Sequence, residues 1–106
     1  MTDQDRLDHI IESIDRTERI AKGLSKEGFL SNETVKYACY ASLIILSEAV
    51  ARLSKEYKQK YENIEWDLIV GFRNIIIHEY FRVDWNIVWD VIDENLPKLR
   101  KQLELN

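Results

Sequence analysis

The sequence predicts an all-α fold, an antiparallel up-and-down bundle of four to five helices. The chain has only three Gly and one Pro in 106 residues, so it offers few of the turns that many short strands would need. Apolar residues also recur at helical spacing along most of the chain. The length fits one domain, residues 1–106, and short connections between successive helices imply antiparallel neighbours.

Two long helices are predicted in the first half of the chain. The second, from about Glu33 to Tyr57, is apolar around most of its circumference in the middle, which indicates a central position. Gly23 and Gly28 bracket the connector before it. The first helix, from about Asp3 to Lys22, carries one apolar stripe that we expect to be buried: Leu7, Ile10, Ile11, Ile14 and Ile20.

Two further helices are predicted in the second half. The third runs from about Glu65 to His78, and the segment "YFRV" then turns the chain. Asp84 is the expected N-cap of the fourth helix, and Pro97 predicts a kink or a new helical start near Leu96. The expected core residues are Leu68, Ile69, Phe72, Ile75 and Ile76 of the third helix and Ile87, Val88, Val91 and Ile92 of the fourth.

The stretch "GFRNIIIHEY", residues 71–80, places polar groups in an apolar segment. Burial of such groups costs free energy unless each finds a partner. On a helix, Gly71, Asn74 and His78 share a second face, where Gly71 leaves a notch for a backbone or phosphate. Val70 and Ile77 are interleaved with this cluster, a pattern expected when the cluster faces a partner surface.

Each of these residues also has an ordinary structural interpretation. A helical histidine such as His78 is usually held by a backbone carbonyl or a carboxylate, and Tyr80 at a helix end is usually a packing residue. The tryptophans Trp66, Trp85 and Trp89 are expected to be core or interface anchors.

Composition excludes several classes of protein. The net charge of -4 lacks the basic footprint of bulk nucleic-acid binding, so RNA would be held only at a local site and no DNA partner is expected. The two histidines lie far apart and no Cys pair occurs, so neither a metal site nor a cofactor is predicted. Cys39 reads as core packing. The charged N-terminus and the short apolar runs predict no signal peptide, no membrane partner and a cytoplasmic location.

The chain resembles the HepT family, the helical toxins of the HEPN superfamily that are paired with MntA-type minimal nucleotidyltransferases. The resemblance runs nearly end to end through "DRLDHIIESI", "LIILSEAVARLS", "IEWDLIVGFRNIIIHEYFRVDWNIVWDVI" and "ENLPKLRKQLE". Its diagnostic element is an Arg, four residues, a His, any residue and a Tyr, which here are Arg73, His78 and Tyr80. Ser47 departs from the family pattern, where Gly usually precedes Glu-Ala.

The resemblance implies a homodimer whose two Arg/His motifs meet in a cleft at the interface. It implies metal-independent endoribonuclease cleavage of cellular RNA, with tRNA among the expected substrates. Arg73 and His78 would be catalytic, with support from Asn74 and Gly71 and aid from Arg82. Tyr80 would accept AMP groups from the nucleotidyltransferase antitoxin.

Two other functions compete with a toxin ribonuclease. A non-catalytic helical dimer could serve as the binding platform and modification substrate of the nucleotidyltransferase, which the acidic charge favours. A purely structural bundle would leave the polar cluster on the third helix unexplained.

Overall fold

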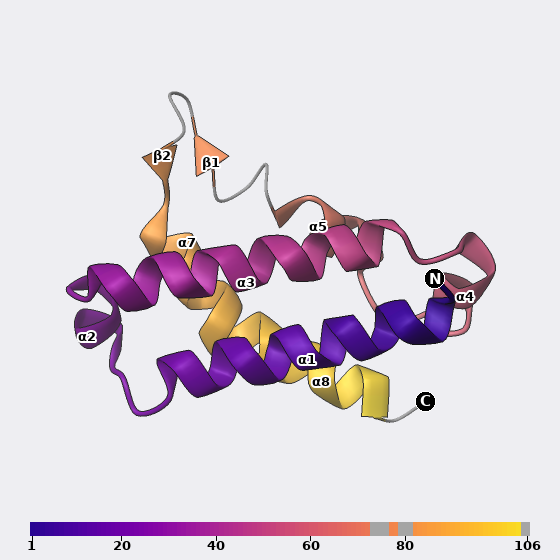
Figure 1. Cartoon of the computed structure of the whole chain (residues 1–106), viewed down its shortest axis with the longest axis horizontal. Coiled ribbons are helices and arrows are strands. Elements are labelled where there is room, and N and C mark those ends of the chain that lie inside the picture. The colour runs from indigo at the N-terminus through magenta and orange to yellow at the C-terminus, as the bar shows by residue number, and fades with distance from the viewer. Residues whose placement is uncertain (73–76, 79–81, 105–106) are drawn as a thin grey trace.

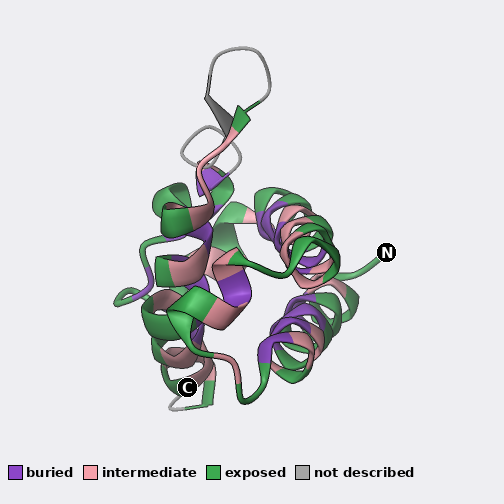
Figure 2. Cartoon of the chain, turned by 90° about the vertical axis from the view of Figure 1, so that its left-hand side faces the viewer, coloured by how far each residue is buried: buried purple, intermediate pink, exposed green. Residues whose placement is uncertain are grey.

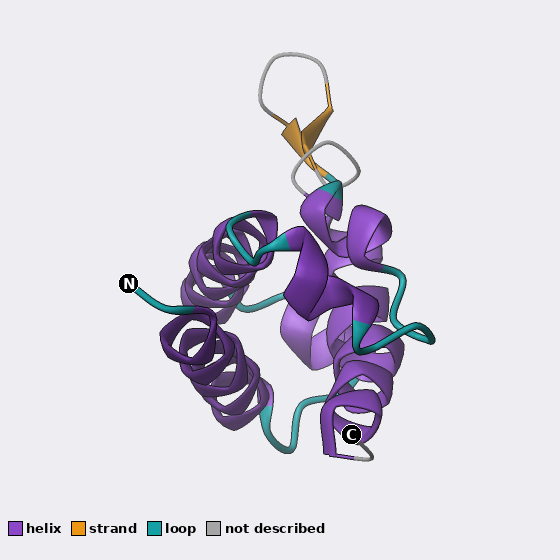
Figure 3. Ribbon diagram, turned by 90° about the vertical axis from the view of Figure 1, so that its right-hand side faces the viewer, coloured by secondary structure: helices purple, strands orange, loops and turns teal. Residues whose placement is uncertain are grey.

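The fold of the described residues is mostly helical, as the sequence predicts. The computed structural model describes residues 1–72, 77–78 and 82–104, including all side chains except those of residues 77 and 78. Within these residues the only strands are β1 (Ile77–His78) and β2 (Arg82–Val83), which pair antiparallel. They lie outside the helical body (Figure 3).

Two long helices, α1 (Asp3–Ala21) and α3 (Glu33–Ala51), lie side by side and antiparallel (Figure 1). Thr2 begins α1 with a reciprocal capping box, and Asn32 caps α3 by accepting the Val35 N–H. The short helix α2 (Lys26–Leu30) lies within the predicted connector, which turns through Gly23 at a φ of +80°. The first helix thus has the predicted extent to within one residue.

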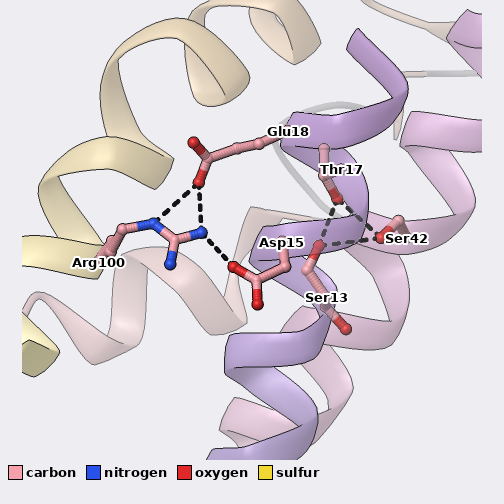
Figure 4. Close-up of polar contacts among 6 residues, drawn as sticks. All are labelled: Ser13, Asp15, Thr17, Glu18, Ser42 and Arg100. Carbon is pink, nitrogen blue, oxygen red and sulfur yellow. Dashed lines mark hydrogen bonds and ion pairs between the residues drawn. The ribbon is translucent and has the colours of Figure 1, made fainter. Parts of the chain in front are cut away.

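The contact between α1 and α3 contains a buried hydroxyl cluster that the apolar pattern did not predict. Thr17 Oγ1 lies 2.7 Å from the Ser13 carbonyl oxygen and 2.7 Å from Ser42 Oγ (Figure 4). Arg16 covers the cluster, donating from Nε to Ser42 Oγ and from Nη2 to Ser13 Oγ. Leu7, Ile10 and Ile14 are buried as expected, whereas Ile11 is exposed and Ile20 is only half-buried.

The prediction of one helix from Glu33 to Tyr57 is wrong. The chain leaves the helix after Ala51 and begins α4 (Lys55–Gln59) at Ser54, whose hydroxyl accepts the Tyr57 N–H. Asp3 accounts for the break, because its carboxylate accepts hydrogen bonds from the Ser54 N–H at 2.8 Å and from the Ser54 hydroxyl at 2.6 Å. The cap itself is a local bond, whereas the contact between Asp3 and Ser54 joins residues 51 positions apart and is not visible in local propensity.

The C-terminal arm is continuous but changes its helical pitch. It consists of α7 (Trp85–Asp90), the π-helical turn η2 (Val91–Asn95) and α8 (Leu96–Glu104). Asp84 caps α7 as predicted, accepting the N–H groups of Asn86 and Ile87. The new helical start at Leu96 is also confirmed, one residue before Pro97, which lacks the N–H of a regular α-helix.

The arm closes the core against the α1–α3 pair. Arg100 of α8 donates to Asp15 and Glu18 of α1 (Figure 4). The residues coloured as buried lie mainly on the sides of the helices that face one another (Figure 2). By its length and apolar composition alone, α3 could cross a membrane. Its buried apolar residues Cys39, Leu43, Leu46 and Val50 instead pack within this core. The most deeply buried apolar side chains are Ile10, Ile14, Phe29, Cys39, Leu43, Leu46, Val50, Val88 and Leu96.

Candidate active site

The segment that leads to the Arg/His motif is firmly anchored. Helix α5 (Trp66–Val70) buries Trp66 and Ile69, and the next buried side chain is Phe72. The Trp66 indole Nε1–H donates to the Lys58 carbonyl oxygen at 3.0 Å, which ties α5 to α4. The expected core residue Leu68 is instead 40% exposed. Ile75 and Ile76 lie outside the described residues.

Gly71 lies at the end of α5, not in the middle of a longer helix. Its N–H donates to the Asp67 carbonyl oxygen at 3.0 Å, and its φ of −79° is open to any residue. A Cβ at this position would lie 3.2 Å from the same Asp67 oxygen, which is a tight approach. Glycine therefore relieves crowding at the end of α5. Because α5 ends here and His78 is in a strand, Gly71 and His78 do not share one continuous helical face.

His78 lies in a strand, so the prediction of a helix from Glu65 to His78 is wrong at its C-terminal end. The backbone of β1 pairs with β2 in the register Ile77 to Val83 and His78 to Arg82. Arg82 and Val83 of the predicted turn are thus strand residues. A run of isoleucines fits a strand as well as a helix, because β-branched residues pack well on a pleated surface.

The structure places only part of the predicted site. Arg73, Asn74 and Tyr80 lie outside the described residues, and His78 is described only by its backbone. Their mutual geometry is therefore still a prediction. What the structure adds is a register, in which Arg82 lies directly opposite His78.

A hollow beside β2, lined by both polar and apolar side chains, was not predicted from the sequence. It has a volume of about 530 Å³ and is lined by Leu30, Lys36, Arg82, Val83, Asp84, Trp85 and Asn86. Lys36 Nζ lies 5.1 Å from the centroid of the Trp85 ring, a cation–π distance. Tyr37 and Tyr40 approach the same ring edge-on, at centroid distances of 5.0 and 6.3 Å.

The sequence carried a weak signal for this hollow. The sequence predicts Trp85 to be an anchor, and Tyr37 and Tyr40 do hold its ring against α3. Trp89 is likewise an anchor, 5.4 Å from Phe29 between ring centroids. Lys36 is a cation in the first turns of the mostly apolar helix α3, and only the fold brings it to the same hollow as Arg82.

Two other reactive groups are suppressed by their surroundings. Burial raises the pKa of the Cys39 thiol to about 11, so Cys39 is protonated and unreactive at neutral pH. Burial, with a smaller contribution from a hydrogen bond with Tyr61, raises the pKa of Tyr57 to about 12. In the part of the chain that the structure describes, no three His, Cys, Asp or Glu side chains gather closely enough to hold a metal ion.

Comparison with known proteins defines the class as a small helical ribonuclease. A family model described as "Ribonuclease HepT-like" matches residues 10–105. The chain therefore belongs to the HepT-like ribonuclease family, as the resemblance implied. No solved structure matches it significantly.

Three relatives illustrate the similarity. A protein of Caldanaerobacter subterraneus named "Putative RNase" is 37% identical over 98 residues, covering 92% of this chain and 88% of that protein. Another of that name from Methanocaldococcus jannaschii is 32% identical over 96 residues, covering 91% and 88%. A "Probable ribonuclease HepT" of Thermococcus cleftensis is 29% identical over 101 residues, covering 95% and 92%.

Proposed function

We propose that this protein is the toxin of a toxin–antitoxin system, a metal-independent endoribonuclease that cuts cellular RNA, with tRNA among its targets. The observation that carries the proposal is the family match, which spans residues 10–105 and so includes the whole motif Arg73, His78 and Tyr80. These residue types suit the chemistry, because none of the steps below needs a metal.

His78 exchanges protons and Arg73 stabilises charge in the proposed reaction. A ribose 2′-oxygen attacks the adjacent phosphorus as one His78 accepts its proton, since imidazole titrates near neutral pH. The bond from phosphorus to the 5′-oxygen breaks, and a protonated His78 of the second subunit supplies the leaving oxygen with a proton. Arg73 donates to the phosphorane oxygens, and Asn74 holds the imidazole or a phosphate oxygen. The products are a 2′,3′-cyclic phosphate and a free 5′-hydroxyl.

This division of acid and base requires two subunits, and the surface of the chain is compatible with a homodimer. Contiguous exposed apolar groups mark interaction sites in many proteins. Helices α3 and α5 pack together and expose four large apolar side chains: Tyr37 (54%), Ile45 (51%), Leu68 (40%) and Val70 (38%). We propose that exposed apolar side chains of these two helices, here called the apolar face, pair with a second copy.

Alanine substitution in the motif tests the reaction. We expect His78→Ala and Arg73→Ala each to lose roughly 10²–10⁴-fold in RNA cleavage measured in the presence of a chelator. His9→Ala is the matched control, because His9 is an exposed residue of α1. Full cleavage by His78→Ala, or cleavage that stops on addition of chelator, would contradict the mechanism.

Tyr80 is the proposed site of neutralisation, where an MntA-type nucleotidyltransferase antitoxin transfers AMP from ATP to the phenolic oxygen and releases pyrophosphate. An added phosphate beside Arg73 would compete for the donors that the substrate needs. Tyr57 and Tyr61 are poorer acceptors: the pKa of Tyr57 is raised to about 12, and Tyr61 is buried.

Intact mass tests the acceptor directly. After incubation with the cognate antitoxin, ATP and magnesium, AMP increments should appear on the wild-type chain and on Tyr57→Phe but not on Tyr80→Phe. Tyr80→Phe should keep its ribonuclease activity and remain toxic in the presence of the antitoxin. Increments that persist in Tyr80→Phe would place the acceptor elsewhere.

A second candidate function is a non-catalytic platform for the nucleotidyltransferase. The observation in its favour is the net charge of -4, which opposes RNA binding over most of the surface. Under this alternative, AMP transfer to the chain would be normal and no RNA would be cut by the wild-type protein.

A further inference from the structure

The hollow beside β2 is the place in the described structure where cationic and aromatic side chains meet near the motif. Arg82 lies directly opposite His78 in the strand register, so the hollow begins at the residue facing the proposed catalytic position. Lys36 reaches it from α3 and Trp85 from the start of α7. Three segments distant in sequence therefore form one wall.

The chemistry of the wall matches a nucleotide. A nucleotide combines a flat base with an anionic phosphate, and proteins that hold single-stranded RNA commonly offer an aromatic ring beside cations. Here Lys36 Nζ is 5.1 Å from the Trp85 ring centroid, so cation and ring are already adjacent. The edge-on contacts of Tyr37 and Tyr40 hold the ring in one orientation, which lowers the entropy lost when a base contacts it.

The local charge is also favourable within an acidic protein. Lys36 and Arg82 are cationic, and Asp84 is the acidic group in the wall. The carboxylate of Asp84 is engaged at the start of α7, where its Oδ1 accepts two backbone N–H groups. The hollow thus has a local excess of positive charge, although the whole chain carries a net charge of -4.

We propose that this hollow is an RNA subsite, which holds a nucleotide next to the scissile phosphate with its phosphate on Lys36 and Arg82 and its base against Trp85. The inference rests on the proposed ribonuclease function, since it assigns the same substrate to a neighbouring site. It also explains how an acidic chain can bind RNA locally.

A binding measurement separates the subsite from the chemistry. The probe is a fluorescently labelled single-stranded RNA of about ten nucleotides, titrated into the full-length His78→Ala protein, which is not expected to cut it. Adding Lys36→Gln or Arg82→Gln should weaken binding several-fold and lower the slope of log affinity against log salt by about 0.7 each. The control is Lys55→Gln, an exposed lysine of α4 at the other end of α3 (Figure 1), which should change affinity less than about twofold.

A second readout reports on the ring without changing it. In the nuclear magnetic resonance spectrum, the Trp85 indole N–H signal, assigned with Trp85→Phe, should shift as RNA is added to the His78→Ala protein. The Trp66 indole, which donates to the Lys58 carbonyl oxygen, serves as the internal control and should not move.

The outcomes are decisive for the subsite and independent of the reaction. The subsite is supported if RNA affinity falls only in Lys36→Gln and Arg82→Gln and the Trp85 indole signal shifts. Variants that behave like Lys55→Gln, a stationary Trp85 signal or an absence of RNA binding would each overturn it. Failure of the proposed reaction would appear separately, as wild-type protein that binds RNA through these residues but does not cleave it.

Discussion

The carboxylate of Asp3 connects α1 to the start of α4. Both of its oxygens accept hydrogen bonds from Ser54, and these bonds hold the pKa of Asp3 below its ordinary value of 3.8. The side-chain bond from the Ser54 hydroxyl is the largest cause and the backbone bond the next. This contact therefore holds the start of α4, just after the end of α3, against the first turn of α1.

A pH-dependent contribution to stability follows from this shift. Since the pKa is lower in the folded state, the unfolded chain binds more protons, so the contribution is complete above pH 3.8 and is lost as the pH falls through the folded pKa. We expect Asp3→Asn to melt at a lower temperature than the wild type at pH 6, with the difference shrinking below about pH 4. The measurement is thermal unfolding by circular dichroism, with the exposed Asp93→Asn as the control. A difference that is independent of pH would contradict the assignment.

The buried hydroxyl of Ser42 is expected to stabilise the packing of α1 against α3. It lies within hydrogen-bond distance of Thr17 Oγ1, the Ser13 carbonyl oxygen and Arg16 Nε. Its removal breaks the bonds to these three atoms within a buried cluster, so we expect Ser42→Ala to lower the free energy of unfolding by about 1–3 kcal/mol. Ser31→Ala is the control, because the Ser31 hydroxyl is exposed and bonds only locally to Gly28. Equal urea midpoints for the two variants would show that the cluster is not stabilising.

At the scale of elements, the sequence predicts helix starts better than helix ends. Asp84 is recognisable as a cap because it bonds to N–H groups two and three residues later. The end of α3 depends instead on Ser54 and Asp3, which lie 51 residues apart. His78 lies in a strand and not in the predicted helix, and this strand pairs with Arg82. A run of isoleucines contains no signal that decides between helix and strand.

The short helix α5 and Phe72, two residues after its end, attach the motif segment to the core. We expect Phe72 to be the strongest of these attachments. This side chain is 3% exposed and lies with Ile69, Leu96 and Leu99 against α8. We expect Phe72→Ala to lower the free energy of unfolding by about 3–5 kcal/mol, since a large cavity replaces the ring. The control Gln59→Ala shortens an exposed side chain of α4 and should change stability by less than about 0.5 kcal/mol. Chemical denaturation of both variants measures the difference, and similar losses would contradict the role of Phe72.

At the scale of the whole molecule, the fold class was predictable and the hollow beside β2 was not. Helical periodicity and scarce Gly and Pro led to the all-α class, and the motif led to the ribonuclease family. The hollow beside β2 required the packing of α3, β2 and α7, because Lys36 and Arg82 become neighbours only in the folded chain. Net charge described the average surface and carried no information about this local arrangement.

The assembly of two copies is the last expectation, and a charge placed on the apolar face tests it. Ile45 on α3 and Leu68 on α5 are 51% and 40% exposed, so Ile45→Arg or Leu68→Glu should leave the fold intact. Each would bury an unpaired charge in the proposed interface, a penalty of several kcal/mol that a dimer of modest affinity cannot offset. In sedimentation at micromolar concentration, we expect the wild type to be a dimer and both variants to be monomers.

Cleavage should be lost together with the dimer, because the proposed reaction takes its acid and its base from different subunits. Ile11→Arg is the matched control: Ile11 is 37% exposed, but it lies on α1, away from the apolar face of α3 and α5. This variant should remain dimeric and active. A monomeric wild type would refute the dimer. Monomeric variants that cut RNA at the wild-type rate would instead show that one subunit carries out both proton transfers.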